Sequence, residues 1–309
     1  MNQNKTVTSG KKKTCIVLVG PTAVGKTAVA MQLAQQYNTA VISADSRQCF
    51  KEMTIGVAKP STEQLQSVPH YFINSHTVTE EVNARIFEAY ALKKAEELFL
   101  SKDVIIVAGG TGLYINAFCN GMDEIPDIDV AVRNKIIEGY KTNGINWLQK
   151  QVKDEDPVYF GSGEIHNPQR LMRALEVKLS TGKSIRSFQT KHKAERDFNI
   201  IKIGLELPKE QLHRNIHHRV DSMLQDGLIE EVKSLINYRH LNALQTVGYK
   251  EIFEWLDGKT SLEKAVEDIK KNTRHYAKRQ MTWFRKDTNT KWFSMDDIVS
   301  LVSLLDAGI

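Results

Sequence analysis

The residues Gly20-Pro-Thr-Ala-Val-Gly25-Lys26-Thr27 match the pattern of a phosphate-binding loop, or P-loop. In such a loop, backbone N–H groups and the N-terminus of the following helix surround a phosphate. The Lys26 ammonium adds a positive charge, and the Thr27 hydroxyl is a suitable ligand for Mg²⁺. The sequence therefore predicts a diphosphate or triphosphate site. Its expected binding residues are Gly20, Thr22, Ala23, Val24, Gly25, Lys26 and Thr27.

A second acidic residue, common in P-loop proteins that hydrolyse nucleotides, is missing from its usual place. That acid ends a later strand and completes the Mg²⁺ site, but the apolar run at 104–108 ends in Gly109-Gly110-Thr111-Gly112. A carboxylate follows a different strand, at 41–44, where Asp45 begins the segment Asp-Ser-Arg-Gln. There, Asp45 can act as a general base toward a second substrate, or it can simply cap the next turn.

A P-loop needs a strand before it and a helix after it, and the sequence supplies both. Residues 14–19 form an apolar, β-branched run, and residues 27–37 carry apolar side chains at helical spacing. Strand and helix patterns then alternate to about residue 117, which predicts a parallel sheet flanked by helices. The expected elements of this region are strands at 14–19, 40–44 and 104–108 and helices at 27–37 and 83–100.

The pattern changes between Asn116 and about Glu195, where it becomes helical and more polar. We expect helices there at 130–140, 145–152 and 168–180, then a strand at 198–205 and further helices at 210–226, 228–238, 247–256 and 261–284. The fold class is therefore predicted as α/β, a P-loop NTPase-like parallel sheet with an inserted helical domain and a helical C-terminal segment. The expected boundaries are a disordered tail at 1–13, a core at 14–117 and 196–309, and an insertion at 118–195.

Composition is that of a soluble globular enzyme, with 309 residues, 41% hydrophobic and 26% charged. The three cysteines, Cys15, Cys49 and Cys119, are widely spaced and odd in number. They fit neither a disulfide framework nor a zinc site, and they suit a reducing cytoplasm. No apolar run reaches the length of about 18 residues that spans a bilayer. We therefore expect a cytoplasmic protein with no membrane partner.

Positive charge is concentrated in two segments. In residues 270–291, Lys and Arg far outnumber acids and are interleaved with Tyr276, Trp283 and Phe284. This mixture suits a nucleic-acid backbone with an exposed base, although a solvated helix face gives the same pattern. In the second segment, Arg170 and Arg173 fall on one helix face, where phosphates or neighbouring acids could pair with them. The two segments together favour an RNA or DNA substrate.

Taken together, these motifs resemble the tRNA dimethylallyltransferase family, also called tRNA isopentenyltransferases. The resemblance covers nearly the whole chain and includes GPTAVGKT at 20–27, ADSRQ at 44–48, AGGTGLYI at 108–115, NPQRLMRALEV at 167–177, VGYKE at 247–251 and TRHYAKRQMTWFRK at 273–286. Family members transfer a dimethylallyl group from dimethylallyl diphosphate to N6 of adenosine 37, next to the anticodon. The resemblance implies an isoprenoid diphosphate in the P-loop, with Mg²⁺ as cofactor, and so accounts for the missing acid.

The resemblance also implies residue roles. Asp45 is similar to the family's catalytic base, Thr111 to a threonine beside the reacting centre, and Arg219 to an arginine that reaches the diphosphate. The inserted domain is expected to bind tRNA, the partner is expected to be the anticodon stem-loop, and the enzyme is expected to be a monomer. The implied tRNA-binding residues are Asp45, Ser46, Arg47, Gln48, Thr111, Arg133, Gln169, Arg170, Leu171, Met172, Arg173, Gly248, Tyr249, Lys250, Thr273, Arg274, Lys278, Arg279 and Gln280.

Two positions depart from the usual family pattern: Arg47 stands where methionine is common, and Gln245 where some members carry arginine. The chain lacks the Cys/His zinc finger of many eukaryotic members and so resembles the bacterial type. Three alternatives remain open. An adenylate isopentenyltransferase would not need the basic helix, a P-loop kinase or NTPase would need the missing acid, and a non-catalytic RNA-binding protein would leave Asp45 without a function.

Overall fold

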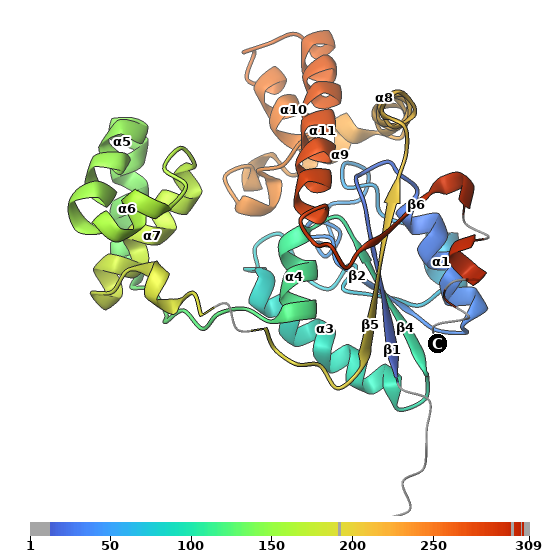
Figure 1. Ribbon diagram of the computed structural model, residues 1–309. Coiled ribbons are helices and arrows are strands. Elements are labelled where there is room, and N and C mark those ends of the chain that lie inside the picture. Colours follow the sequence, from blue (N-terminus) through green and yellow to red (C-terminus); the bar gives the residue numbers. More distant parts are fainter. Residues whose placement is uncertain (1–12, 191–192, 298–299, 304, 306–309) are drawn as a thin grey trace, which may run out of the picture. The chain divides into compact units, whose positions relative to one another are not determined.

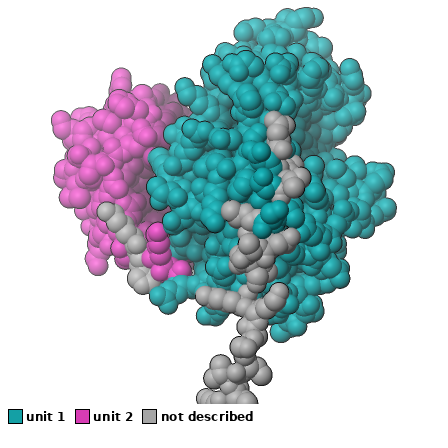
Figure 2. Space-filling model, turned by 45° about the vertical axis from the view of Figure 1, so that its right-hand side comes forward, with its two compact units in different colours: residues 1–120, 195–309 teal, residues 121–194 magenta. Residues whose placement is uncertain are grey.

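The computed structural model of the protein describes residues 13–190, 193–297, 300–303 and 305. The predicted disordered tail, apart from its last residue, lies outside these described residues. The chain divides into two compact units, of which the first comprises residues 1–120 and 195–309 and the second residues 121–194 (Figure 2). Sequence analysis placed the insertion at 118–195.

Six parallel strands form the sheet of the first unit, in the order β3-β2-β4-β1-β5-β6 (Figure 1). The central strand, β1 (Thr14–Val19), is buried along its whole length, as its apolar sequence predicts. The predicted parallel sheet is confirmed. Two strands, β3 and β6, were not predicted because each is too short to give a pattern. The other bounds are β2 (Val41–Ser43), β3 (His70–Tyr71), β4 (Val104–Gly109), β5 (Asn199–Glu206) and β6 (Lys291–Ser294).

Helices cover both faces of this sheet. The crossover from β1 to β2 and the crossover from β3 to β4 run in opposite directions across the sheet, so right-handed connections place their helices on opposite faces. Figure 1 shows α1 (Lys26–Gln36) on one side and α3 (Ala84–Phe99) with α4 (Gly112–Asn120) on the other. The prediction missed α4 and a short helix α2 (Thr62–Ser67).

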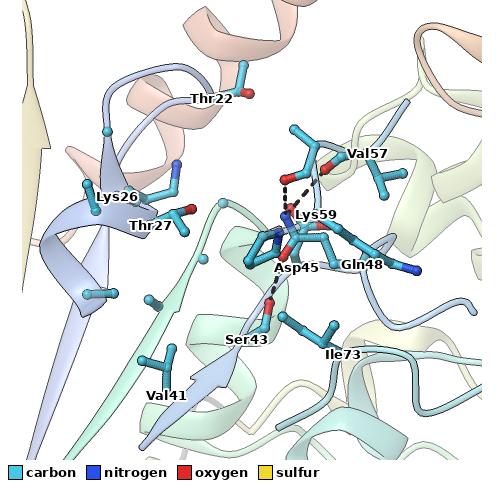
Figure 3. Close-up of a pocket in the computed structure, with 18 of the residues that line it drawn as sticks. Thr22, Lys26, Thr27, Val41, Ser43, Asp45, Gln48, Val57, Lys59 and Ile73 are labelled. Carbon is cyan, nitrogen blue, oxygen red and sulfur yellow. Dashed lines mark hydrogen bonds between the residues drawn. The ribbon is translucent and has the colours of Figure 1, made fainter. Parts of the chain in front are cut away.

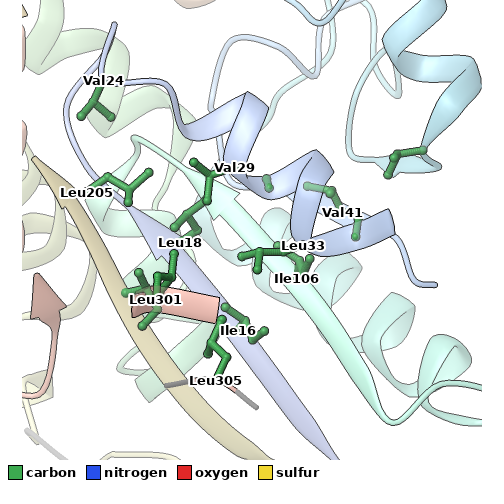
Figure 4. Close-up of a cluster of buried hydrophobic side chains, with 14 of the residues drawn as sticks. Ile16, Leu18, Val24, Val29, Leu33, Val41, Ile106, Leu205, Leu301 and Leu305 are labelled. Carbon is green, nitrogen blue, oxygen red and sulfur yellow. The ribbon is translucent and has the colours of Figure 1, made fainter. Parts of the chain in front are cut away.

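The core between α1 and the sheet anchors the P-loop (Figure 4). Val29 and Leu33 of α1 lie one helical turn apart and pack with Ile16 and Leu18 of β1. These four side chains are 0–1% exposed. The strand and the helix on either side of the P-loop are therefore held by one continuous apolar cluster, which fixes the loop between them.

Helices α8 to α11 follow β5, and α8 and α10 both pack against the long helix α11 (Figure 1). Ser261 caps α11 by accepting the backbone N–H of Lys264. The predicted helix at 228–238 is shorter, because a 3₁₀ turn at Ile236–Tyr238 follows α9. The bounds are α8 (Lys209–Gln225), α9 (Leu228–Ser234), α10 (Tyr249–Leu256) and α11 (Leu262–Phe284).

The second unit is helical, as predicted, and has its own apolar core. It contains α5 (Val130–Glu155), α6 (Pro157–Ser162), which was not predicted, and α7 (Pro168–Thr181). Gly144 interrupts α5 with a φ of 73°, so the two helices predicted on either side of it are present in that element. Across the described residues of both units, no helix combines the length and apolarity needed to cross a membrane.

Candidate active site

The P-loop lines a cavity of about 400 Å³ at the carboxyl end of the sheet, which we call the P-loop cavity (Figure 3). Gly20 has a φ of 152°, and a Cβ on it would lie 2.6 Å from the carbonyl oxygen of Leu205, so only glycine fits there. Val24, which is predicted to bind phosphate through its backbone N–H, has its side chain in the apolar core. The P-loop residues that line the cavity are Thr22, Ala23, Gly25, Lys26 and Thr27.

Lys26 is turned toward its own loop. Its Nζ donates to the carbonyl oxygens of Gly20 and Pro21 at 2.9 and 2.7 Å. Burial disfavours the charged ammonium and, together with nearby Arg219, lowers the pKa of Lys26 to about 7. A bound diphosphate would bring the opposite charge and favour protonation.

We therefore expect Lys26 to take up a proton when a diphosphate ligand binds at pH 8. The free side chain is mostly neutral above its pKa of about 7, and the ligand raises that pKa, so affinity should fall as pH rises above 7. Calorimetric titrations in buffers of different ionisation enthalpy should show an uptake approaching one proton. In Lys26→Arg, which stays charged throughout, that uptake should disappear. Equal uptake by both proteins would contradict the assignment.

Asp45 follows β2 and faces the same cavity (Figure 3). Its Oδ1 accepts the backbone N–H groups of Arg47 and Gln48 at 2.9 and 3.3 Å, so the carboxylate does cap the next turn. Among the described residues, no hydrogen bond is made to its Oδ2. Capping and proton abstraction are therefore compatible, because they use different oxygens of one carboxylate.

A second cavity of about 470 Å³, the helix cavity, is lined by residues of α8, α10 and α11 and by residues 45–47 and 56–58. Each cavity by itself could hold one small molecule or one base. Six residues line both cavities: Thr22, Asp45, Val57, Ala58, Arg219 and Tyr276. Ligands that occupied the two cavities would therefore meet beside Asp45 and Arg219.

Arg219 reaches this meeting point from α8. Its Nη1 donates to the Thr22 hydroxyl at 3.1 Å, which joins the helix to the P-loop. Burial lowers the pKa of Arg219, and the charge of Asp45 opposes that shift. The guanidinium still remains charged at neutral pH, because the ordinary pKa of arginine lies far above 7. It can therefore attract negative charge from either cavity.

The segment between the two cavities, residues 54–58, depends on Glu231 of α9, which sequence analysis missed. The Glu231 carboxylate accepts the backbone N–H groups of Thr54, Ile55 and Gly56 at 2.8–2.9 Å. It also accepts the hydroxyl of Tyr249 at 2.5 Å. Nothing in the local sequence distinguishes Glu231 from an ordinary acid in the first turn of a helix.

Replacing Glu231 with glutamine should lower the free energy of unfolding by about 2 kcal/mol, since a neutral amide supports fewer of these charge-assisted hydrogen bonds. Urea denaturation would measure the change. The matched control is Glu230→Gln, because Glu230 is exposed and its ion pair is a loose one, with Lys233 Nζ 3.8 Å from its Oε1. The control should stay within about 0.5 kcal/mol of the wild type. Equal stability of the two variants would show that the Glu231 contacts contribute little.

Several predicted site residues make hydrogen bonds within the protein or are buried. The Thr111 hydroxyl accepts the backbone N–H of Ser46 at 3.0 Å, and in the described part of the chain Thr111 lines neither cavity. Gln48 donates to the carbonyl oxygens of Val57 and Ala58 (Figure 3). Three side chains expected to bind RNA are buried at 0–6% exposure, which leaves them little surface for a partner: Leu171, Tyr249 and Gln280.

The remaining residues expected to bind RNA divide between the two units. In the first unit, Lys278 is exposed on α11, and Arg274 lies 2.6 Å from His217 through its Nη1. The residues of this group that line the helix cavity are Ser46, Arg47, Gly248, Lys250, Thr273 and Arg279.

In the second unit, the three arginines expected to contact RNA each have an acidic neighbour. Arg133 and Arg173 lie 3.9 and 3.6 Å from Glu176, and Arg170 lies 3.5 Å from Glu164. The arginine side chains remain 41–56% exposed. Of the other residues expected to bind RNA in this unit, Gln169 is exposed and Met172 is half-buried. The arginines therefore keep donors that a phosphate could reach.

A Mg²⁺ ion in this site would have few protein ligands among the described residues. In the described residues, no group of three or more His, Cys, Asp or Glu could hold a metal ion by itself. The Thr27 hydroxyl does line the P-loop cavity, and Mg²⁺ is commonly bound by one or two protein oxygens together with substrate phosphates.

Comparison with known proteins identifies relatives along nearly the full chain. The family model of the IPP transferases matches residues 48–287. The chain is 46% identical over 297 residues to a tRNA dimethylallyltransferase of Cytophaga hutchinsonii, covering 96% of this chain and 98% of that relative. It is similarly 42% identical over 297 residues to tRNA dimethylallyltransferase 1 of Bacteroides fragilis, covering 96% and 99%.

Solved structures of similar proteins share the fold of this chain. A tRNA isopentenylpyrophosphate transferase from Bacillus halodurans superimposes with a TM-score of 0.70 at 34% identity, covering 96% of each chain. A eukaryotic dimethylallyltransferase acting on tRNA gives a TM-score of 0.75 at 27% identity, covering 91% of this chain and 74% of that chain. The fold of the sheet and its surrounding helices is thus shared with these proteins.

Proposed function

The chain belongs to the IPP transferase family, and on this basis we propose that it transfers a dimethylallyl group from dimethylallyl diphosphate to N6 of adenosine 37 in tRNA, releasing diphosphate. The observation that carries the proposal is the pair of cavities that meet at Asp45 and Arg219. One is built around a phosphate-binding loop, and the other lies beside a basic helix. Such an arrangement suits a donor with a diphosphate and an acceptor presented by RNA.

The chemistry follows from the residues at the meeting point. The adenosine N6 attacks C1 of the donor while the bond from C1 to the diphosphate oxygen breaks, and N6 loses a proton. Asp45 Oδ2 is proposed to take that proton, since Oδ1 is engaged by backbone N–H groups. Lys26, Arg219 and the loop N–H groups are proposed to stabilise the charge growing on the diphosphate. When bound through Thr27 and the phosphates, Mg²⁺ would supply further charge stabilisation.

An adenosine stacked in an anticodon loop must leave the stack to enter the helix cavity. We propose that the exposed cations of α11 hold the RNA backbone next to this adenosine, and that the arginines of the second unit bind RNA phosphates. Adenylate isopentenylation is disfavoured because a free nucleotide needs no such surface. The close relatives are named for tRNA, which also supports the RNA substrate.

Affinity for an anticodon stem-loop should fall steeply with salt, because each cation that neutralises a phosphate releases a counterion. Fluorescence anisotropy across a salt series would measure the slope of log Kd against log salt. Lys278→Ala, which removes an exposed α11 cation, should reduce that slope by about 0.7–0.9. The matched control is Lys259→Ala, since Lys259 pairs with Asp257 at 2.8 Å outside α11. A flat wild-type series would contradict the proposed surface.

The proposal is tested by incubating the enzyme with labelled dimethylallyl diphosphate and Mg²⁺, and offering either an unmodified stem-loop or AMP. Label on the stem-loop, recovered after nuclease digestion as N6-dimethylallyl adenosine, is the expected result. Label on AMP alone would replace the proposal with a free-nucleotide prenyltransferase. No transfer to either acceptor would refute prenyl transfer.

We also propose that the enzyme works as a cytoplasmic monomer. tRNA modification supports the compartment, and so do the three cysteines, which are all buried free thiols. Sedimentation of the enzyme alone and with a stem-loop would test the monomer.

A further inference from the structure

Gln280 lies on the buried side of α11, where it contacts two loops of the site. Its Oε1 accepts the backbone N–H of Thr22 at 2.8 Å, and its Nε2 donates to the carbonyl oxygen of Gly110 at 2.9 Å. The side chain is 6% exposed and lines the P-loop cavity. One buried amide thus bridges the P-loop and the loop between β4 and α4.

Gly110 in the β4–α4 loop and Gly112 at the start of α4 explain how closely this bridge fits. A Cβ on Gly110 would lie 2.2 Å from Gln280 Nε2, and a Cβ on Gly112 would lie 2.2 Å from Cδ1 of Trp283, also on α11. Both glycines therefore leave space for side chains of the same helix. The position of the Gly110 Cβ would also be only 3.9 Å from Lys26 Nζ, so the bridge stands next to the phosphate-binding lysine.

The contacts to Thr22 show which part of the loop is held. Gln280 binds its backbone N–H, and Arg219 binds its hydroxyl at 3.1 Å. Two C-terminal helices therefore fix one residue of the P-loop. That leaves the later N–H groups of the loop, from Ala23 onward, for a phosphate.

We propose that Gln280 is a positioning residue for the diphosphate. It holds the P-loop and the β4–α4 loop at the separation at which Lys26 and the loop N–H groups converge on the ligand. The inference rests on the proposed function for the identity of the donor. The contact between the loop and a diphosphate, however, requires no RNA and can be measured separately.

Two variants break the bridge from opposite sides. Gln280→Met removes both hydrogen bonds at similar volume. Gly110→Ala displaces the amide, and it should fold because its Cβ meets only the flexible end of Gln280 within 3 Å. Each should weaken binding of inorganic diphosphate about tenfold, measured calorimetrically with Mg²⁺ present, and should raise the KM for the donor but not for the stem-loop. The double variant should be no weaker than either single one, because the same bonds are lost.

Gln225→Met, an exposed change on α8, is the matched control and should bind diphosphate as the wild type does. Wild-type affinity in both bridge variants, with or without a lower melting temperature, would overturn the positioning role. Losses that multiply in the double variant would overturn it too, because the changes would then act independently. A wild-type enzyme that binds diphosphate but modifies no stem-loop would refute the proposed function and leave the Gln280 result intact.

Discussion

Asp45→Asn should lower kcat for transfer to a stem-loop by between about 10² and 10⁴-fold, the range expected when a general base is lost. Asparagine keeps the oxygen that accepts the N–H groups of Arg47 and Gln48, so the turn after β2 should persist. Its amide cannot accept the proton that N6 must release. Single-turnover measurements at saturating RNA would isolate the chemical step from binding.

The controls separate the base from the cap. Asp45→Asn should bind both the stem-loop and inorganic diphosphate with wild-type affinity. Asp45→Ala should lose the same activity and also destabilise the fold by about 1 kcal/mol, since the turn loses its acceptor. A rate for Asp45→Asn near that of the wild type would show that another group, or water, takes the proton.

Arg219→Gln should reduce kcat by about 10²- to 10³-fold, with a smaller change in the KM for dimethylallyl diphosphate. The guanidinium lies where the two cavities meet, so its charge should act most strongly as negative charge grows on the departing diphosphate. A glutamine is polar but carries no charge, and its side chain is shorter than that of arginine, so the bond to the Thr22 hydroxyl is lost as well. Steady-state kinetics with varied donor at saturating RNA would give both parameters.

The matched control for this change is Arg214→Gln, because Arg214 is exposed on the same helix. It should leave kcat unaffected. If Arg219→Gln raised KM and left kcat unchanged, the arginine would bind substrate and transition state equally well, and its catalytic assignment would be wrong.

The central fold could be predicted because its signals are local. β1 and α1 flank a loop whose glycine spacing is diagnostic, and Val29 and Leu33 repeat at the spacing of one helical turn. Asp45 could be expected at the carboxyl end of the sheet because it directly follows an apolar strand. The same reasoning failed for β3 and β6, because strands of two and four residues are too short to show a recognisable hydrophobic pattern.

The contacts that shape the site could not be predicted, because they join distant parts of the chain. Glu231 is 175 residues from Gly56, and Gln280 is 170 residues from Gly110. In the sequence, the residues around Glu231 resemble an ordinary helix start, and the residues around Gln280 resemble a basic helix. The family resemblance assigned Tyr249 and Gln280 to RNA binding. In the structure both side chains are buried and make contacts inside the protein. A motif locates a functional region, but it does not separate the residues that touch a ligand from those that position them.

A crystal structure of the enzyme with an anticodon stem-loop and an unreactive thiodiphosphate analogue of the donor would show directly whether the two substrates meet at Asp45. We expect the diphosphate against residues 22–27, and the flipped adenine in the helix cavity with N6 within about 3 Å of Asp45 Oδ2. An adenine bound outside that cavity, or a carboxylate other than Asp45 next to N6, would contradict the proposed mechanism.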